Sequence, residues 1–538
     1  MTPRRILVHW TRLLVAACAV IAAALPASIA AQPTGDKVLN VGLYIEPQSA
    51  DPHNVEVATL LRELNSVYEG LVDVTEKIMV YEPVLATSWT VSDNGLTYTF
   101  KLRKGVKFSD GTPFNAEAVK VNYDRVMAIK RGPFAAVKQI QAVEIVDEGT
   151  VRMRLHQASG VFLATMRQFM MVSPAVINAN AGADHAQSWL NEHTAGTGPY
   201  KIERWQRGSV LTLVRNEHAW RGWTGKEFDR INLRVILEAE TQRLMLQQGQ
   251  LDIAQIISID ALPSLKRNPQ IRVVESEYAG QMYFFLNSAL EPTSDPRVRK
   301  AIGHAWNHEK YKTLRKGIAP RADGAAPNAL FGAGYGFTNP YNYDIEKARK
   351  LLTEAGIKKG TALTVLVQKG DEQKRMLVEV LRDELAPLGI EITMYEGTWP
   401  AIWKRMTDWG AARDAALNWH IAIFYKSPDL WTPWTFLYRM FHTDTHLHKP
   451  SGQYNMGLYS NPAVDKAIDE ASLMLDADKA TPLWRKANET IVADAPVIPI
   501  EKMVEIAVMR SDIQGYVFRP YETGRKIDFY RLSRAPRR

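Results

Sequence analysis

Residues 85–126 read LATSWTVSDNGLTYTFKLRKGVKFSDGTPFNAEAVKVNYDRV, and the fold of the chain can be worked out from this stretch. Apolar and polar side chains alternate over residues 97–103, which predicts a strand with one buried face. Turn sequences flank this strand at Asn94-Gly95 and Asp110-Gly111, because Gly tolerates positive φ and Asn or Asp bonds to the local backbone. Asn115 then stands where a helix N-cap is expected, ahead of apolar residues at helical spacing. The stretch therefore predicts a strand, a turn and a helix.

The same stretch resembles the segment that marks the peptide/nickel-type extracellular solute-binding proteins, family 5, of ABC transporters. The resemblance rests on Leu85-Ala86, Trp89, Tyr98-Thr99-Phe100 and the run FSDGTP at residues 108–113. These residue types recur at fixed offsets over about forty positions, which a chance match to a short motif does not produce. The alternative is an ordinary surface hairpin and helix in an unrelated protein. Further matches extend the resemblance over essentially all of the chain that follows the N-terminal segment.

Length and composition are those of a globular protein of several domains. The chain has 538 residues, which predicts about two to four domains. The hydrophobic fraction of 46% and charged fraction of 23% argue against extensive disorder. The net charge is +8, but three of the positive charges lie in the N-terminal segment and the others are interleaved with acidic residues. We therefore expect no nucleic-acid partner.

Residues 1–30 have the pattern of a signal peptide. Arginines precede an apolar run at residues 13–25, and small residues follow up to Ala31, which predicts cleavage after Ala30 or Ala31. The apolar run is short for a permanent membrane helix, and no later stretch reaches the roughly 18 apolar residues that such a helix needs. We expect export and a periplasmic protein without a membrane span.

The single cysteine, Cys18, is the one residue of the chain that could carry a lipoprotein-type lipid anchor. Val15-Ala16-Ala17-Cys18 looks like a lipoprotein box, but apolar residues continue after it where a polar tether is expected. A free periplasmic protein is therefore favoured over a lipoprotein. Cleavage then leaves no cysteine, which excludes disulfides, thiolate nucleophiles and thiolate metal sites.

The resemblance implies an α/β fold of the two-lobed periplasmic binding protein kind (type II, cluster C-like) with an extra small domain. Strands and helices alternate over residues 362–394, which independently favours an α/β lobe. The expected division places residues 31–82, 197–286 and 509–538 in lobe I, 83–196 in the small domain II and 287–508 in lobe III. Two crossings between lobes imply a cleft that closes by hinge rotation.

Two parts of the chain supply candidate ligand contacts through the resemblance. The loop after Asp51-Pro52-His53 is expected to reach the cleft, so its candidates are Val55, Glu56 and Val57; a solvated loop is the alternative. Residues 399–441 are dense in aromatic side chains, which suit a carrier because they bury large area at low entropy cost. The candidates there are Trp399, Trp419, Tyr425 and Trp431, with burial in the core as the alternative for each.

One departure from the family pattern bears on the cargo. Peptide-binding members place an aspartate shortly before the proline that corresponds to Pro428, where it pairs with the α-amino group. Residues 419–428 here read WHIAIFYKSP and hold no aspartate. A buried ammonium without a carboxylate is costly, so an ordinary free-amine peptide becomes a doubtful cargo. Lys426 favours an anionic or neutral cargo, unless Asp429 compensates through a shifted loop.

Motifs of common enzyme classes are absent: the sequence has no P-loop, no Rossmann glycine pattern, no G-x-S-x-G and no H-E-x-x-H. The candidates for a metal site are His442, His446 and His448, with Asp444 between them and His420 upstream. Imidazoles bind Ni, Cu or Zn well, but the spacing matches no recognised closed site. An exposed loop is the default interpretation.

The sequence thus predicts the periplasmic substrate-binding component of an ABC importer, not an enzyme. Its partners are a small solute (peptide-like, a modified amino acid, an opine or similar) and the transmembrane permease subunits; we expect a monomer without a cofactor. The alternatives are a carrier of a nickel or other metal chelate, a secreted metal-dependent hydrolase that uses the histidine cluster, and a receptor that only senses its ligand.

Overall fold

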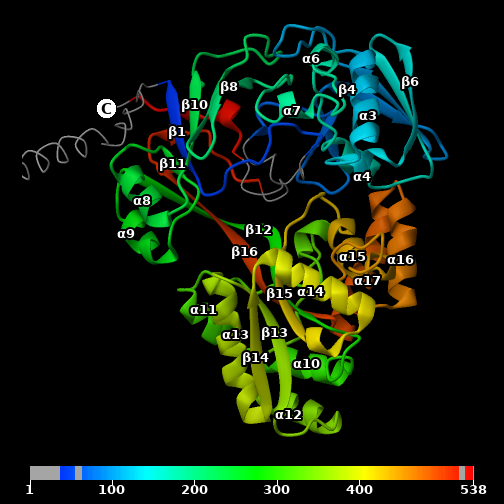
Figure 1. The fold of residues 1–538 in the computed structure, drawn as a ribbon, viewed down its shortest axis with the longest axis vertical. Helices are drawn as coiled ribbons and strands as arrows, with labels where there is room; N and C mark the ends of the chain where they lie inside the picture. The colour runs from blue at the N-terminus through cyan, green and yellow to red at the C-terminus, as the bar shows by residue number, and fades with distance from the viewer. Residues whose placement is uncertain (1–36, 55–63, 520–526, 537–538) are drawn as a thin grey trace, which may run out of the picture.

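The computed structural model describes residues 37–54, 64–519 and 527–536. The expected signal peptide with Cys18 lies outside this part of the chain, and so do Val55, Glu56 and Val57. Within the described ranges, no helix combines the length and the apolar character that crossing a bilayer requires. Figure 1 shows an upper body that holds the N-terminal strands and the small domain, and a lower body built from the later part of the chain.

Ten strands of the described chain form one sheet that runs through both bodies. Their order across the sheet is β14-β13-β15-β12-β16-β11-β1-β10-β9-β8. The upper strands are β1 (Val38–Leu43), β8 (Tyr200–Gln206), β9 (Val210–Arg215), β10 (Arg230–Val235) and β11 (Ile253–Ala254). The lower strands are β13 (Thr361–Gln368), β14 (Ile390–Gly397) and β15 (Ile421–Lys426).

Two long antiparallel strands, β12 (Ile271–Leu286) and β16 (Val497–Arg510), pass from one body to the other. The lower part of β12, from Ala279 on, packs in the lower core, whereas Val274 packs against the upper core. In β16 the change falls between Ile500 and Ile506, and the pairing of the two strands shifts register between Glu277 and Gln281. The change from one core to the other therefore falls within both strands, several residues before the expected boundaries after residues 286 and 508.

The small domain confirms the prediction of a strand, a turn and a helix. Its sheet has the order β4 (Ala86–Val91), β5 (Thr97–Leu102), β7 (Thr150–Leu155) and β6 (Ile140–Asp147). Tyr98 and Phe100 of β5 are buried, Gly95 has a φ of 70°, and the Asn115 side chain accepts a hydrogen bond from the backbone of Ala118. The helix that Asn115 caps is α3 (Ala116–Ile129), which packs beside β6.

The core of the small domain ends earlier in the sequence than the expected range of 83–196. Buried residues between Leu71 and Met171 form this core. Ile177 of α6 (Pro174–Ala179) and Leu190 of α7 (Gln187–Leu190) pack instead in the core of lobe I. The range of 83–196 for domain II stays a prediction, and the packing of α6 and α7 favours assigning its last part to lobe I.

Short helices complete the upper body, and longer ones flank the lower strands. The upper helices not yet named are α4 (Phe134–Val137), α5 (Phe162–Met166), α8 (Ala239–Gln247) and α9 (Leu262–Lys266). The lower helices are α10 (Pro296–Ala305), α11 (His308–Leu314), α12 (Ile345–Glu354), α13 (Glu372–Leu385), α14 (Trp399–Ala412), α15 (Trp434–Phe441), α16 (Pro462–Leu473) and α17 (Ala477–Asp494). Small strand pairs join β2 (Val72–Val74) to β3 (Tyr81–Pro83) and β17 (Ile513–Gln514) to β18 (Ser533–Arg534).

A buried ion pair fixes the small domain to lobe I. Arg125 of α3 donates to both carboxylate oxygens of Asp51, at 2.9 and 2.6 Å, and both side chains are almost fully buried. The same guanidinium lies 2.9 Å from Nδ1 of His53, whose Nε2 is 2.9 Å from the carbonyl oxygen of Met170. Nδ1 therefore accepts from Arg125, and Nε2 donates its proton to Met170. The segment Asp51-Pro52-His53 is thus a buried contact between lobe I and the small domain.

Candidate functional site

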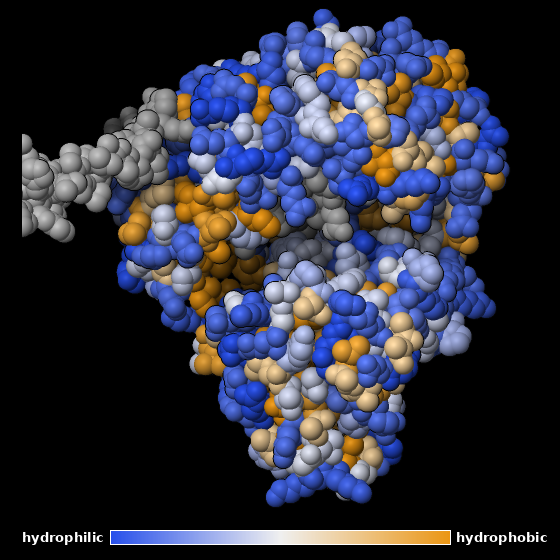
Figure 2. Space-filling view, in the orientation of Figure 1, coloured by the Kyte–Doolittle hydropathy of each residue, from blue (hydrophilic) through white to orange (hydrophobic). Residues whose placement is uncertain are grey.

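The segment that follows β15 lies where the two lobes meet. The backbone carbonyl of Asp429 accepts a hydrogen bond from Nε2 of Gln168, a small-domain residue, at 3.0 Å. The indole Nε1 of Trp431 donates at 3.2 Å to the carbonyl of Glu76, which lies between β2 and β3. Figure 2 shows the surface hollowed between the upper and lower bodies. Two of the predicted contact residues, Asp429 and Trp431, are therefore at the lobe boundary.

The hinge strand β12 contributes to the same boundary. The hydroxyl of Tyr278 hydrogen-bonds Ser427, and Gln281 is paired with Lys426 across the sheet. Tyr278 lies within the register shift of β12, where the strand leaves the upper lobe. The predicted contact Lys426 thus stands at the end of β15, directly beside the point where the chain crosses between lobes.

Aromatic side chains line the lower side of this boundary. The Trp399 ring, at the start of α14, stacks on Phe424 of β15 with centroids 5.4 Å apart and an interplanar angle of 15°. The Tyr454 ring lies 5.9 Å from Phe424, also stacked. The Tyr425 ring also stacks on Phe424, with centroids 5.9 Å apart, and Tyr425 is 46% exposed. The predicted residues Trp399 and Tyr425 therefore belong to one aromatic surface, which also includes two rings that the sequence did not single out.

Trp419 lies elsewhere. Its side chain is fully buried in the lower core, with its ring packed edge-on against Trp409 at 6.3 Å. The alternative weighed for this residue, burial in the core, describes its position. Trp419 precedes β15 at the end away from the hinge, so its burial reflects the strand's entry into the core. We no longer count it among the candidate contacts.

A cluster of charges lies next to the aromatic surface. The carboxylate of Asp429 accepts hydrogen bonds from both Lys426 and Arg439 of α15. Burial alone would raise the pKa of Asp429, but the charges of Lys426 and Arg439 outweigh it and lower this pKa. The Tyr454 ring centre lies 5.0 Å from the Lys426 ammonium and 4.7 Å from the Arg439 guanidinium carbon, which are cation–π distances. Asp429 is therefore ionised and held between two cations.

Sequence reasoning missed Arg439 and Tyr454. Arg439 is ten residues from Asp429 on the next helix, and Tyr454 is fifteen further along. No short motif links these positions, because helix α15 and the following loop bring them together. The only available signal was their membership of the aromatic-rich stretch and its continuation.

At the other end of the boundary, both lobes line a cavity of about 160 Å³. Its polar centre is Glu501 of β16, which is 3% exposed and accepts hydrogen bonds from the Tyr311 hydroxyl at 2.9 Å and from Gln373. Burial raises the pKa of Glu501, and the nearby charge of Arg315 opposes this rise in part. The other lining residues include an apolar set from both lobes: Ile256, Ile257, Ile259, Ile318, Val504 and Ile506.

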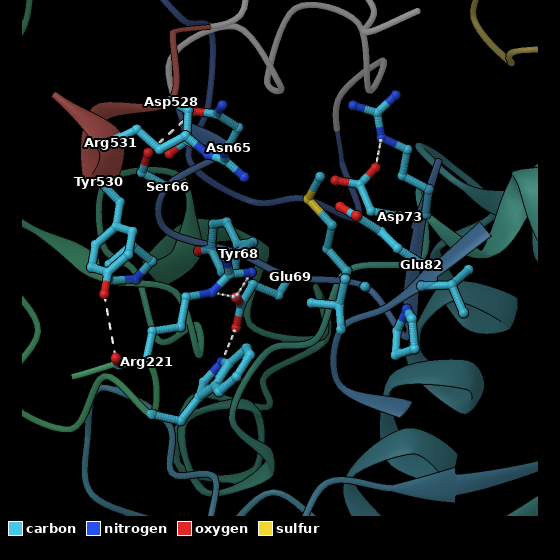
Figure 3. Close-up of a pocket in the computed structure, with 18 of the residues that line it drawn as sticks. Asn65, Ser66, Tyr68, Glu69, Asp73, Glu82, Arg221, Asp528, Tyr530 and Arg531 are labelled. Carbon is cyan, nitrogen blue, oxygen red and sulfur yellow. Dashed lines mark hydrogen bonds and ion pairs between the residues drawn. The ribbon is translucent and has the colours of Figure 1, made fainter. Parts of the chain in front are cut away.

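A polar cavity of about 290 Å³ lies within the upper body alone (Figure 3). Glu69 accepts hydrogen bonds there from Thr197, Trp220 and Arg221, at 2.8 to 3.2 Å. Asp73 pairs with Arg167 at 2.7 Å. Glu69, Asp73 and Asp528 are paired with arginines that also line this cavity, and none of its described lining residues comes from the lower lobe. We therefore do not place the candidate site there.

The histidine candidates for a metal site, His442, His446 and His448, are engaged in local packing. Among the described residues, no group of three or more His, Cys, Asp or Glu side chains is arranged to hold a metal ion. His446 Nε2 is 2.9 Å from the carbonyl of Tyr459, and the rings of His446 and His448 are 5.8 Å apart. His442 is buried and stacks on Tyr438 at 4.7 Å. These three histidines are buried or half-buried, whereas Asp444 in the same loop is exposed.

Comparisons with known proteins bear on the whole arrangement. The sequence profile of the bacterial extracellular solute-binding proteins, family 5 Middle, matches residues 80–446. The chain is 30% identical over 512 residues to the probable D,D-dipeptide-binding periplasmic protein DdpA of Escherichia coli (strain K12), covering 93% of this chain and 95% of the relative. It is 29% identical over 526 residues to the glutathione-binding protein GsiB of Escherichia coli O157:H7, covering 94% and 96%.

Solved structures share the fold. NikA from Brucella suis in complex with Fe(III)-EDTA superposes with a TM-score of 0.79 and 24% identity, covering 93% of this chain and all of the other. The periplasmic binding protein DppA from Helicobacter pylori in complex with the peptide STSA gives a TM-score of 0.75 and 24% identity, covering 92% and 98%. The prediction of a two-lobed binding-protein fold is confirmed.

Proposed function

Because the chain belongs to the bacterial extracellular solute-binding proteins, family 5, we propose that it is the periplasmic substrate-binding component of an ABC importer. The observation that carries this role is the pair of lobes with separate cores, joined through β12 and β16. A solute held between such lobes stabilises their closed arrangement. The closed protein then delivers the solute to the transmembrane permease subunits.

The binding surface we propose combines the aromatic surface with the charge cluster. Trp399, Tyr425, Lys426, Asp429 and Trp431 retain their predicted roles as cargo contacts. Tyr278, Arg439 and Tyr454 join them because they contact this set directly. Val55, Glu56 and Val57 stay predictions. The rings bind cargo through apolar area, and the charged groups orient it.

The mechanism we propose is binding and release of the solute, without making or breaking covalent bonds. The family and the curated relatives are binding proteins, which favours this mechanism over hydrolysis. A metal-dependent hydrolase also loses its supporting observation, since the described histidines are not gathered as ligands. A metal chelate remains the alternative cargo to a peptide-like solute, a modified amino acid or an opine, and the metal would then arrive with its own chelator.

Native mass spectrometry of protein purified gently from its own periplasm tests this function, with a metal scan of the same sample. We expect an organic adduct in one-to-one stoichiometry that is lost on denaturation. A metal together with an organic mass would identify a chelate. Turnover of a solute, or a stoichiometric metal that stays without any organic mass, would contradict the carrier function.

A further inference from the structure

We infer that the cargo presents an anionic oxygen group, such as a carboxylate, to the cluster of Lys426, Asp429, Arg439 and Tyr454, and carries no free ammonium at that end. The inference rests on the proposed function and specifies its cargo. It starts from the carboxylate of Asp429, the group best suited by type to receive an ammonium from a ligand.

Asp429 is already engaged by the protein itself. Lys426 and Arg439 both donate to its Oδ2 atom, so the charge of Asp429 is compensated by Arg439 whatever else contacts Lys426. An ammonium at Asp429 would have to approach two cations or displace one of them. Displacement leaves a cation at a partly dry lobe boundary without its counter-ion, which is costly. The cluster therefore disfavours a ligand amine.

Arg439 is held in place with donor capacity to spare. Its Nε donates to the side chain of Gln453 at 2.7 Å, and its Nη1 donates to Asp429. The backbone N–H of Tyr454 donates to the Arg439 carbonyl at 2.9 Å, which fixes the ring beside the guanidinium. Since a guanidinium has five N–H donors, Nη2 remains able to bind a ligand oxygen.

The exposure of the cluster points the same way. The Lys426 side chain is only 5% exposed, whereas the side chains of Asp429 and Arg439 are each 23% exposed. A ligand therefore meets Asp429 and Arg439 first, with Lys426 behind them. Among the described residues, Arg439 has an unused donor at Nη2. Asp429 has an unused acceptor at Oδ1, but a ligand cation there would stand beside the charges of Lys426 and Arg439. Carboxylate recognition by a guanidinium is the interaction this geometry favours.

The test measures the unfolding temperature of ligand-free, full-length mature protein with three pools of probes. All three pools are made from one set of dipeptides. The first pool is N-acetylated with a free carboxylate, the second is zwitterionic, and the third is C-amidated with a free amine. We expect the two pools with a free carboxylate, N-acetylated and zwitterionic, to raise the unfolding temperature more than the C-amidated pool does. A larger shift with the amidated pool would overturn this inference and leave the carrier function standing. A shift with none of the pools would overturn both for peptide-like cargo.

Variants then assign the effect to the cluster. Arg439→Gln should lower the affinity for the best N-acetylated probe roughly tenfold or more in calorimetric titration, because one charge-assisted hydrogen bond is lost. The matched control is Lys404→Gln, an exposed lysine of α14 that is paired only with Asp408 among the described residues. The double variant Lys426→Met with Arg439→Gln frees Asp429 and should shift the preference toward the amidated probes. Unchanged probe preference in the double variant would contradict the proposal.

Discussion

The ion pair between Asp51 and Arg125 has almost no contact with solvent, so its two charges depend on each other. Arg125→Met keeps much of the side-chain volume but leaves the Asp51 carboxylate buried and unpaired. We expect the free energy of unfolding to fall by about 3–5 kcal/mol, the usual cost of breaking a buried pair. Urea titrations followed by circular dichroism measure this loss.

The same helix supplies the control. Lys120 and Asp124 form an exposed pair one turn apart on α3, with the Lys120 side chain 39% exposed. Lys120→Met should change the free energy of unfolding by less than about 0.5 kcal/mol. Equal losses for the two variants would show that burial of the Asp51–Arg125 pair carries no special weight.

His53 beside this pair gives a pH dependence with a definite sign. Burial, assisted by the charge of Arg125, lowers the pKa of His53 to about 4. At pH values between the ordinary histidine pKa of 6.5 and this lowered pKa, the unfolded chain binds a proton that the folded chain does not. Stability should therefore fall as the pH falls from about 6.5 to about 4, with His53 contributing roughly 3 kcal/mol.

The variant His53→Gln isolates this contribution, because glutamine does not titrate. Unfolding midpoints measured from pH 7 to pH 4 should fall less steeply for the variant than for the parent protein. Parallel pH curves would contradict a neutral, buried His53. The carboxylates of the chain titrate in both proteins, so only the difference between the two curves is compared.

At the scale of elements, the small domain contacts helix α16 of the lower lobe through Gly160. Its backbone N–H donates to the carbonyl of Ser472 at 2.9 Å, and a Cβ on Gly160 would lie 1.9 Å from the carbonyl oxygen of Met474. Gly160→Ala should therefore prevent this contact and favour separated lobes. We expect a larger radius of gyration in X-ray scattering and weaker cargo binding.

Gly336→Ala is the matched control for this contact. Gly336 is an exposed residue of the lower lobe; a Cβ there meets no atom within 4 Å, and its φ is not positive. It should leave scattering and affinity unchanged. If Gly160→Ala gave the same scattering curve and the same affinity as the parent protein, closure would not depend on this contact.

For the whole molecule, the two lobes have separate cores and can unfold in separate transitions. Cargo should therefore stabilise both lobes only if it lies between them. At a cargo concentration one hundred times its dissociation constant, binding should add about 2.7 kcal/mol to stability. Differential scanning calorimetry should show every unfolding transition of the cargo-free protein moving upward. The loss of this shift in Trp399→Ala would tie it to the aromatic surface. A shift confined to one transition would place the cargo inside a single lobe.

The sequence by itself determined the features that depend on neighbouring residues. The alternation around Tyr98 and Phe100, the turn at Gly95 and the cap at Asn115 are local patterns, and each is present in the folded chain. The same stretch carried the family resemblance, from which the two-lobed fold followed. Local patterns are reliable here because backbone geometry and capping hydrogen bonds involve residues only a few positions apart.

Only the tertiary structure decided which side chains meet. Trp399 and Trp419 were both candidate contacts in the sequence, yet one lies on the lobe boundary and the other is enclosed in the core. Arg439 pairs with Asp429, and the crossings between the lobes lie in the middle of β12 and β16. Burial and charge pairing depend on contacts between distant segments, so the packing of strands and helices settles them and local spacing does not.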